Sequence, residues 1–479
     1  MISSDTREFG SLIGGAEVFS GRWLPVISPW SGQQTGRISH ADPEQVQAAI
    51  EAAAPVRLSL SRYERSQILN RMADHIMTEI APLGRMITDE TGLSLQDTQY
   101  EVIRVADVLR FAAIGALQDD SEVYPCDITA QGRNRRIYTM RQPLRLISAI
   151  TPFNHPMNQV AHKIAPAIAT NNKVILKPSE KTPLSAYYFA RLAYDCGLPP
   201  EALTVVNGDV PALAPLLTSH PDITLVSFTG SSAIGKQIAR EAGYKKLVLE
   251  LGGSSVMIIM DDYDPEAAAD IAVSGIFKNS GQRCTCIRRF LVQAGIADRF
   301  AEALAARAAA LRCDDPYDPD TQVGTVISGQ AAISMEEKVK DAVGRGATLL
   351  TGNIRDGALY RPTVVDHLQN HFPLVSTETF GPIASILRFN TLDEAIRIAN
   401  DTPYGLSGAV VTHRWDVMQR VITELETGTV NVNEAPSYRL EWSPFGGIKD
   451  SGLGYKEGVL EAMKAYTYLK TYSLPWDRP

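Results

Sequence analysis

The sequence predicts an α/β protein with two doubly wound parallel sheets, and three observations support this. Short β-branched runs alternate with helical segments from Leu144 onward, which is the pattern of parallel strands joined by crossover helices. A second series of the same kind begins near Ser255. The chain has 479 residues, of which 44% are hydrophobic and 21% charged, so it is long enough for two or three ordinary globular domains.

The first 120 residues are predicted to be mostly helical after an irregular start. Asp42-Pro43-Glu44 supplies an N-cap, a proline and an acidic first turn for one helix. Apolar residues at helical spacing predict further helices over 62–79 and 95–117. The segment 121–140, around Gln131-Gly132-Arg133-Asn134, is predicted to be a hairpin.

Two series of strands are then predicted from runs of apolar and β-branched residues. Those of the first sheet are expected over 146–150, 173–176, 203–206, 224–228 and 246–249. Those of the second are expected over 256–260, 289–292, 347–350, 383–389, 408–412 and 429–433. The tail over 465–472 is rich in Tyr and Lys, and we expect it to be a strand that pairs with a distant segment.

Composition excludes several classes of function. The net charge of −8 comes without charged blocks, which argues against a nucleic-acid surface. No run reaches the ~20 apolar residues of a membrane-spanning helix, and Met1 to Gly10 lacks the apolar core of a signal peptide. Five scattered cysteines fit a reducing cytoplasm better than a disulfide framework. Cys284 and Cys286 form a C-x-C without a second pair, so no metal site is expected.

Cys284 is the candidate nucleophile. It lies in Gly281-Gln282-Arg283-Cys284-Thr285, between a predicted helix and a predicted strand. A neighbouring guanidinium favours a thiolate, which is the reactive form of cysteine. A buried structural cysteine is the ordinary alternative.

Two strand ends carry candidate cofactor groups. Phe228-Thr229-Gly230-Ser231 ends a strand and opens a helix, so its backbone N–H groups and the Ser231 hydroxyl are placed to bind an anion. Lys177-Pro178-Ser179-Glu180 ends another strand. A carboxylate there suits a ribose 2′-hydroxyl and repels a 2′-phosphate, which favours NAD over NADP.

Two further strand ends carry candidate catalytic groups. Glu250 follows an apolar strand and precedes Leu251-Gly252-Gly253, so burial is expected to raise its pKa toward that of a general base. Asn154, in Thr151-Pro152-Phe153-Asn154, carries an amide suited to an oxyanion. A paired buried acid and a turn asparagine are the respective alternatives.

These motifs, together with Glu378-Thr379-Phe380-Gly381-Pro382 and Pro444-Phe445-Gly446-Gly447, occur in the order and approximate spacing of the aldehyde dehydrogenase superfamily. The chain resembles that superfamily over nearly its whole length. The resemblance implies that Cys284 attacks the aldehyde, that Asn154 and the Cys284 N–H stabilise the oxyanion, and that Glu250 activates water. It also implies a supporting role for Lys163 and for a second, outer glutamate at Glu457.

The same resemblance implies an NAD site and a domain plan. Its contacts are expected at Thr151, Pro152, Phe153, Lys177, Ser179, Glu180, Gly230, Ser231, Leu251, Glu378 and Phe380. Residues 1–124 and 144–251 would form the NAD-binding domain and 252–460 the catalytic domain. Residues 125–143 and 461–479 would form a β-flap that pairs between subunits of a homodimer or homotetramer.

Charged residues at substrate positions predict an anionic aldehyde. Arg104, His155, Arg283 and Arg439, with Thr285, match positions around the family's substrate entrance. A dianionic tetrahedral head group uses several arginines well, and Arg283 beside Cys284 implies a short linker. Within the family the chain most resembles the branch that oxidises phosphonoacetaldehyde. Sulfoacetaldehyde, succinate semialdehyde, lactaldehyde and glyceraldehyde 3-phosphate are the alternative substrates.

Overall fold

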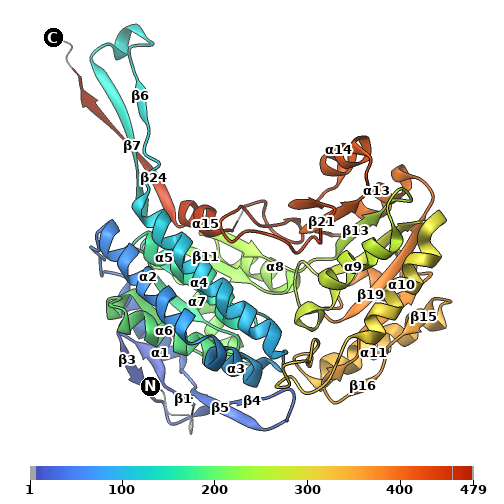
Figure 1. Ribbon diagram of the computed structural model, residues 1–479. Helices are drawn as coiled ribbons and strands as arrows, with labels where there is room; N and C mark the ends of the chain where they lie inside the picture. Colours follow the sequence, from blue (N-terminus) through green and yellow to red (C-terminus); the bar gives the residue numbers. More distant parts are fainter. Residues whose placement is uncertain (1–6, 456, 477–479) are drawn as a thin grey trace.

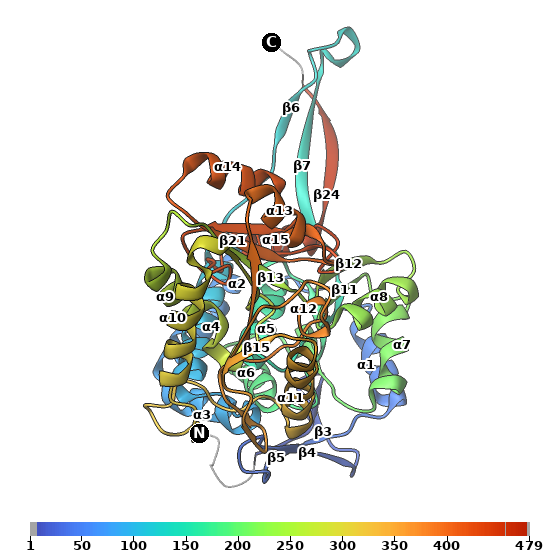
Figure 2. The ribbon, with the colours of Figure 1, turned by 90° about the vertical axis from the view of Figure 1, so that its right-hand side faces the viewer.

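The chain forms two lobes, each built around one seven-stranded sheet, and a ribbon of strands projects from one end (Figures 1 and 2). The computed structural model describes residues 7–455 and 457–476. Residues 1–6, at the predicted start, Lys456, and residues 477–479, at the predicted tail, lie outside the described residues. Within the described ranges, each helix is too short or too polar to cross a membrane.

The first sheet is parallel at its centre, as predicted, and gains an antiparallel edge. Its strand order is β12 (Lys246–Glu250), β11 (Leu225–Thr229), β8 (Leu146–Ile150), β9 (Lys173–Lys177), β10 (Leu203–Val205), β2 (Ser11–Ile13) and β3 (Ala16–Val18). The strands β9, β10 and β11 are buried along their whole length, and β8 is buried except at its last residue, which explains why their sequences are mostly apolar.

Helices enclose this sheet and extend the lobe outward. They are α1 (Pro43–Ala53), α2 (Arg62–Thr78), α3 (Ile80–Thr91), α4 (Leu95–Leu117), α5 (Pro156–Ala169), α6 (Leu184–Asp195), α7 (Val210–Ser219) and α8 (Ser232–Glu241). The helix α4 packs along α2, α3 and α5. Its N-cap, Ser94, accepts a hydrogen bond from the Asp97 backbone N–H, which satisfies one of the donors left open at a helix start.

The second sheet repeats the plan with one antiparallel edge strand. Its order is β15 (Thr348–Thr351), β18 (Thr363–Asp366), β19 (Ile383–Phe389), β14 (Ile287–Gln293), β13 (Ser255–Ile259), β21 (Ser407–Val411) and β22 (Thr429–Val432). Only β15 runs antiparallel to its neighbour. The accompanying helices are α9 (Pro265–Ile276), α10 (Ala297–Ala310), α11 (Gly329–Gly344), α12 (Pro373–Ser376), α13 (Leu392–Asn400) and α14 (Trp415–Glu424).

The projecting ribbon joins two segments that are far apart in sequence (Figure 1). Its order is β24 (Thr467–Pro475), β7 (Arg135–Pro143) and β6 (Val123–Pro125). The pairing of β24 with β7 is antiparallel from Thr467 opposite Pro143 to Pro475 opposite Arg135. The helix α15 (Val459–Ala465) leads into β24. The predicted hairpin and the predicted tail strand are therefore parts of one sheet.

The structure differs from the prediction at the start of the chain, at α3 and at β18. The start of the chain is not irregular, because residues 8–39 hold β1 (Glu8–Phe9), β4 (Trp23–Ile27) and β5 (Gln34–Ser39) as well as β2 and β3. These strands are short and mixed in polarity, so they give no alternating pattern. The helix α3 was missed because only Glu79 separates it from α2, and β18 is a four-residue strand among polar neighbours.

The Cys284 segment lies between the two lobes, at the start of β14. After α9 the chain turns through Asn279, Ser280 and Gly281, which have φ values of 59°, 51° and 68°. This left-handed region disfavours residues with a Cβ. A Cβ on Gly281 would lie 2.3 Å from the Gly381 carbonyl oxygen, so the turn requires glycine at this position.

We expect Gly281→Ala to lower the free energy of unfolding by about 2 kcal/mol or more, because backbone must move and the left-handed φ is strained. Urea unfolding measures this. Gly295→Ala is the matched control, since a Cβ there meets nothing within 4 Å, and its effect should stay within about 0.5 kcal/mol. Equal effects of the two substitutions would contradict the steric argument.

Candidate active site

Hydrogen bonds between the two lobes fix the Cys284 segment. The Asn279 side-chain amide donates to the Asn154 carbonyl oxygen at 3.0 Å, and Asn154 Nδ2 donates to the Gln282 carbonyl oxygen at 2.8 Å. The Gln282 side chain accepts from the Ile327 N–H at 2.9 Å. The segment that carries the thiol is thus tied to the segment that carries the predicted oxyanion donor.

The segment after β8 is held in place by a buried acid. Glu101 of α4 accepts from the backbone N–H groups of Met157 and Asn158 at 3.0 and 2.9 Å. These groups belong to the first turn of α5, just after Asn154 and His155. Burial raises the pKa of Glu101 to about 8. The position of Asn154 therefore depends on α4 as well as on β8.

The Cys284 thiol is half-buried, and burial raises its pKa to about 11. Glu250 and Glu378 add to the rise, whereas Arg439 and, less strongly, Arg283 oppose it. Arg439 is therefore the main cation favouring the thiolate, although Arg283 is adjacent in sequence. Cys286 is fully buried and its Sγ lies 3.1 Å from the Ile276 carbonyl oxygen, so this second thiol faces the core.

One cavity, of about 370 Å³, opens on the Cys284 side of the segment. The predicted residues that line it are Pro152, Phe153, Asn154, Gly230, Ser231, Glu250, Leu251, Cys284, Glu378 and Phe380. Phe153 and Phe380 meet edge to face with ring centroids 5.7 Å apart. A Cβ on Gly252 would lie 2.4 Å from a Glu378 carboxylate oxygen, so glycine is needed for this close approach.

The residues present fit a dinucleotide. Within the described residues, the buried hydroxyls of Thr151 and Thr229 have no hydrogen-bond partner. Thr151 directly follows β8, and Thr229 ends the adjacent strand β11. Ser231 caps α8 by accepting from the Ile234 N–H at 3.4 Å. This N-cap residue lines the cavity, and a helix N-terminus at that place suits a phosphate.

Lys177, Ser179 and Glu180 lie on the same sheet edge but outside that cavity. Lys177 is buried and its Nζ donates to the Glu180 carboxylate at 3.3 Å. The Glu180 side chain is 49% exposed, so it is accessible to a ligand. The Ser179 hydroxyl accepts from the Lys181 N–H at 3.2 Å.

Glu250 and Glu378 enter the cavity from the two lobes. Glu250, the last residue of β12, is 5% exposed. Glu378 accepts from the Gly253 N–H at 3.2 Å, and burial raises its pKa while Arg288 opposes the rise. A buried carboxylate close enough to raise the pKa of Cys284 is suited to proton transfer at this site.

Lys163 lies behind the cavity, on α5. Its Nζ is fully buried and donates to Glu457 at 2.9 Å and to the Ser227 hydroxyl at 2.8 Å. Ser227 is in β11, so the pair joins α5 to the first sheet and to the segment before α15. Lys163 and Glu457 therefore form a buried ion pair behind the site.

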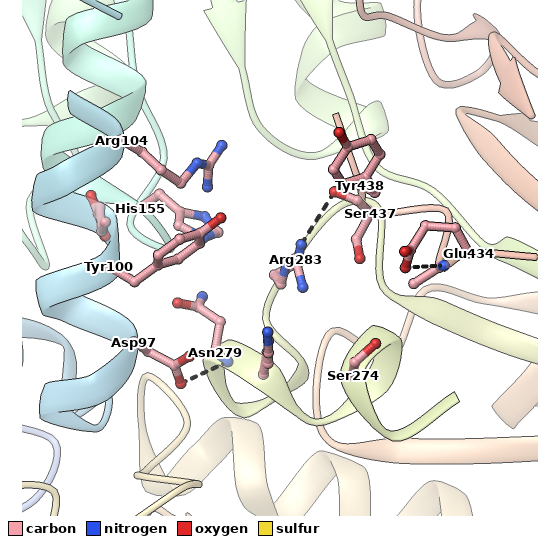
Figure 3. A pocket seen from close by; sticks show the side chains of 13 residues that line it. Asp97, Tyr100, Arg104, His155, Ser274, Asn279, Arg283, Glu434, Ser437 and Tyr438 are labelled. Carbon is pink, nitrogen blue, oxygen red and sulfur yellow. Dashed lines mark hydrogen bonds between the residues drawn. The ribbon is translucent and has the colours of Figure 1, made fainter. Parts of the chain in front are cut away.

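A second, smaller cavity of about 140 Å³ lies on the other side of the Cys284 segment, and Figure 3 shows its lining. Arg104 and Tyr100 extend into it from α4, facing Ser437 and Tyr438 across the space. Arg283 donates to the Ser437 carbonyl oxygen at 3.5 Å, a long bond to a neutral acceptor. Arg283 and Cys284 are thus consecutive residues that line different cavities.

The four predicted substrate groups have different environments. Arg104, His155 and Arg283 line the small cavity, whereas Arg439 is not among its lining residues and its guanidinium lies 4.2 Å from the centre of the Phe445 ring. Burial and the three arginines hold the pKa of His155 well below its ordinary value, so His155 is a neutral group. Thr285, the residue after Cys284, is buried.

Sequence reasoning missed Glu441 and His162. Glu441 accepts from Arg104 Nε at 2.6 Å and lies 2.6 Å from His162 Nε2 and 3.4 Å from Arg439. Burial alone would raise the pKa of Glu441, but Arg439 and Arg104 outweigh it and hold the pKa well below its ordinary value. The sequence does contain a signal for Glu441, because this acid follows the predicted substrate residue Arg439 by two positions.

Known proteins share this architecture. A family model described as the aldehyde dehydrogenase family matches residues 18–472. A 3-sulfolactaldehyde dehydrogenase of Priestia aryabhattai is 33% identical over 465 residues, which cover 97% of each chain.

Two solved structures are similar over nearly the whole chain. An aldehyde dehydrogenase of Physcomitrella patens in complex with the reaction product succinate has a TM-score of 0.94, 30% identity and 98% coverage of both chains. A glyceraldehyde-3-phosphate dehydrogenase of Methanocaldococcus jannaschii complexed with NADP has a TM-score of 0.90 and 34% identity, over 94% of this chain and 99% of that one. The chain therefore belongs to the aldehyde dehydrogenase family.

Proposed function

We propose that this enzyme oxidises phosphonoacetaldehyde to phosphonoacetate, with NAD as oxidant and water as the source of the added oxygen. The observation that carries the proposal is the small cavity on the other side of the Cys284 segment, which Arg104 and Arg283 line. Its volume suits a small head group rather than a long chain. Arg283 and Cys284 are consecutive residues, which supports a short linker between the anion and the reacting carbonyl.

The chemistry follows from the residues around the thiol. Cys284 Sγ attacks the aldehyde carbon, and the Asn154 amide with the Cys284 N–H donates to the developing oxyanion. NAD, when bound, accepts the hydride that leaves this carbon. Glu250 then takes a proton from water, whose oxygen attacks the thioester; the C–S bond breaks and releases the acid.

The large cavity supports the cofactor part of the proposal. We infer contacts from Thr151, Pro152, Phe153, Gly230, Ser231, Leu251 and Phe380, with Glu378 on the nicotinamide side and Lys177, Ser179 and Glu180 on the adenosine side. We further infer an NAD-binding domain of 1–124 and 144–251, a catalytic domain of 252–460, and an intersubunit flap of 125–143 and 461–479 in a homodimer or homotetramer. The scattered cysteines support a cytoplasmic location.

A different small anionic aldehyde is the second candidate. The names of the relatives favour it, because sulfolactaldehyde carries a sulfonate, succinate two carboxylates and glyceraldehyde 3-phosphate a phosphate. A single carboxylate needs one bidentate arginine, whereas a phosphonate dianion uses more donors. The presence of both Arg104 and Arg283 in the cavity favours the phosphonate.

We expect phosphonoacetaldehyde to give a higher kcat/KM than succinate semialdehyde or propanal. The rate is measured by NADH absorbance. Arg283→Ala should lower kcat/KM about 10- to 150-fold for the anionic aldehyde, the value of a hydrogen bond to a charged group, and little for propanal. The matched control is Arg110→Ala, since Arg110 pairs with Asp74 on the outer face. A wild-type preference for propanal would exclude the proposal, and equal losses would assign Arg283 to thiolate activation.

For the cofactor, we expect NAD to give a higher kcat/KM than NADP, because the Glu180 carboxylate repels a 2′-phosphate. Glu180→Gln removes the charge and should raise kcat/KM with NADP by about 10-fold while changing that with NAD less. Steady-state kinetics with each cofactor measure this. Comparable values for both cofactors in the wild-type enzyme would contradict the assignment.

For the nucleophile, we expect iodoacetamide to modify Cys284 slowly at pH 7 and faster as the pH rises toward about 11, the pKa of its thiol in the free enzyme. Arg439→Ala should raise this pKa further, because it removes the cation that most favours the thiolate, and alkylation at pH 8 should slow several-fold. Mass spectrometry after timed labelling gives the rate. A faster reaction in the variant would refute this electrostatic role.

A further inference from the structure

Glu441 connects α4, α5 and the loop that follows β22, close to the small cavity. Its carboxylate accepts from Arg104 Nε of α4 at 2.6 Å, lies 2.6 Å from His162 Nε2 of α5, and lies 3.4 Å from Arg439 of its own loop. Its side chain is only 7% exposed. A carboxylate buried this deeply requires such partners, because isolated buried charges are unfavourable.

The loop that carries Glu441 is fixed at other points as well. Trp442 packs edge to face on Phe111 of α4 with ring centroids 5.5 Å apart. Asn431 Nδ2 donates to the carbonyl oxygens of Ala435 and Tyr438 at 2.7 and 3.1 Å. The loop therefore docks on α4, and the Arg104–Glu441 pair is the charged part of that contact.

The bond to Nε restrains the orientation of Arg104. A guanidinium presents its five N–H groups in a rigid, planar fork, so a carboxylate bound to Nε fixes the direction in which the two terminal nitrogens point. Figure 3 shows the Arg104 guanidinium extending from α4 toward the cavity that Arg283 also lines. Arg104 is thereby presented to a ligand with its fork already placed.

Electrostatics alone gives the opposite expectation. A negative charge next to an anion site repels the anion and weakens its binding. Glu441 therefore strengthens anion binding only if the orientation that it imposes on Arg104 stabilises the bound anion by more than the charge of Glu441 destabilises it. The sign of the effect of removing Glu441 therefore distinguishes the two roles.

We propose that Glu441 is a positioning residue for the anionic group of the substrate, and that it acts by holding Arg104 in the orientation that binds this group. The inference rests on the proposed function in that it assigns the cavity to the anion of an aldehyde. It adds to that function a residue that does not line the cavity.

The test measures both turnover and simple anion binding. We expect Glu441→Gln to raise KM for phosphonoacetaldehyde about 10-fold or more, with kcat and the kinetics of propanal changed less than about threefold. Methylphosphonate, methanesulfonate and propionate then serve as inhibitors of propanal oxidation, and the Ki of the best of them should rise by a similar factor. An unchanged or lower Ki overturns the proposal.

A double-mutant cycle identifies the route of the effect. In an Arg104→Ala background, Glu441→Gln should change the Ki of that anion less than twofold, because the group through which Glu441 acts is missing. A full effect in that background overturns the proposal. Glu434→Gln is the matched control, since Glu434 lines the cavity on the same loop; removing its charge should leave Ki unchanged or lower it.

Glu441→Asp covers the case in which Glu441→Gln does not fold, which thermal unfolding reveals. Aspartate keeps the charge but withdraws the carboxylate, so a positioning role predicts a raised Ki and a purely electrostatic role predicts the wild-type value. If the wild-type enzyme prefers propanal to phosphonoacetaldehyde, the proposed substrate is wrong. The Ki measurements still test the positioning role of Glu441 in that case. If none of the three anions inhibits the wild-type enzyme, the positioning role fails as well.

Discussion

The reciprocal hydrogen bonds between Asn154 and the Cys284 segment are the constraint on which the site depends. Each lobe supplies one of the two segments, and each segment satisfies a polar group of the other: Asn279 reaches the Asn154 carbonyl, and the Asn154 amide reaches the Gln282 carbonyl. Buried amides must be paired in this way. A change in the relation between the lobes would break these bonds, so the sheets and the thiol position are coupled.

The charges around the thiol illustrate how burial and ion pairing compete. Burial opposes ionisation of Cys284, and two nearby carboxylates add to this effect. Burial likewise opposes ionisation of Glu441, yet two arginines overcome it there. Glu441 accepts a hydrogen bond from a guanidinium nitrogen at 2.6 Å, whereas the arginines act on the Cys284 thiol through their charge.

Local patterns were sufficient for most of the fold. Strands such as β8 and β19 are mostly buried apolar runs, and α4 begins and ends where its periodicity indicates. The short strands β1 to β3 could not be predicted, because two or three residues carry no period and depend on distant partners. The family fold was predicted from the order of the motifs along the chain, although each motif is a weak indication alone.

The site was less predictable than the fold, for a physical reason. The motif residues at strand ends meet because parallel strands end at one edge. The partnership of Arg104 with Glu441, in contrast, joins residues 337 positions apart, and nothing local indicates it. Similarly, Arg283 is adjacent to Cys284 in sequence, yet Arg439 has the larger effect on its thiol.

The pairing of β24 with β7 has a consequence for the synthesis of the chain. About 330 residues separate the two strands, so at 5–20 residues per second the ribosome adds β24 roughly 15 to 65 seconds after β7. During that interval β7 has a vacant edge, which is a template for wrong pairing. Its arginines, Arg135, Arg136 and Arg141, are the kind of charged residue that discourages such pairing until the C-terminal strand arrives.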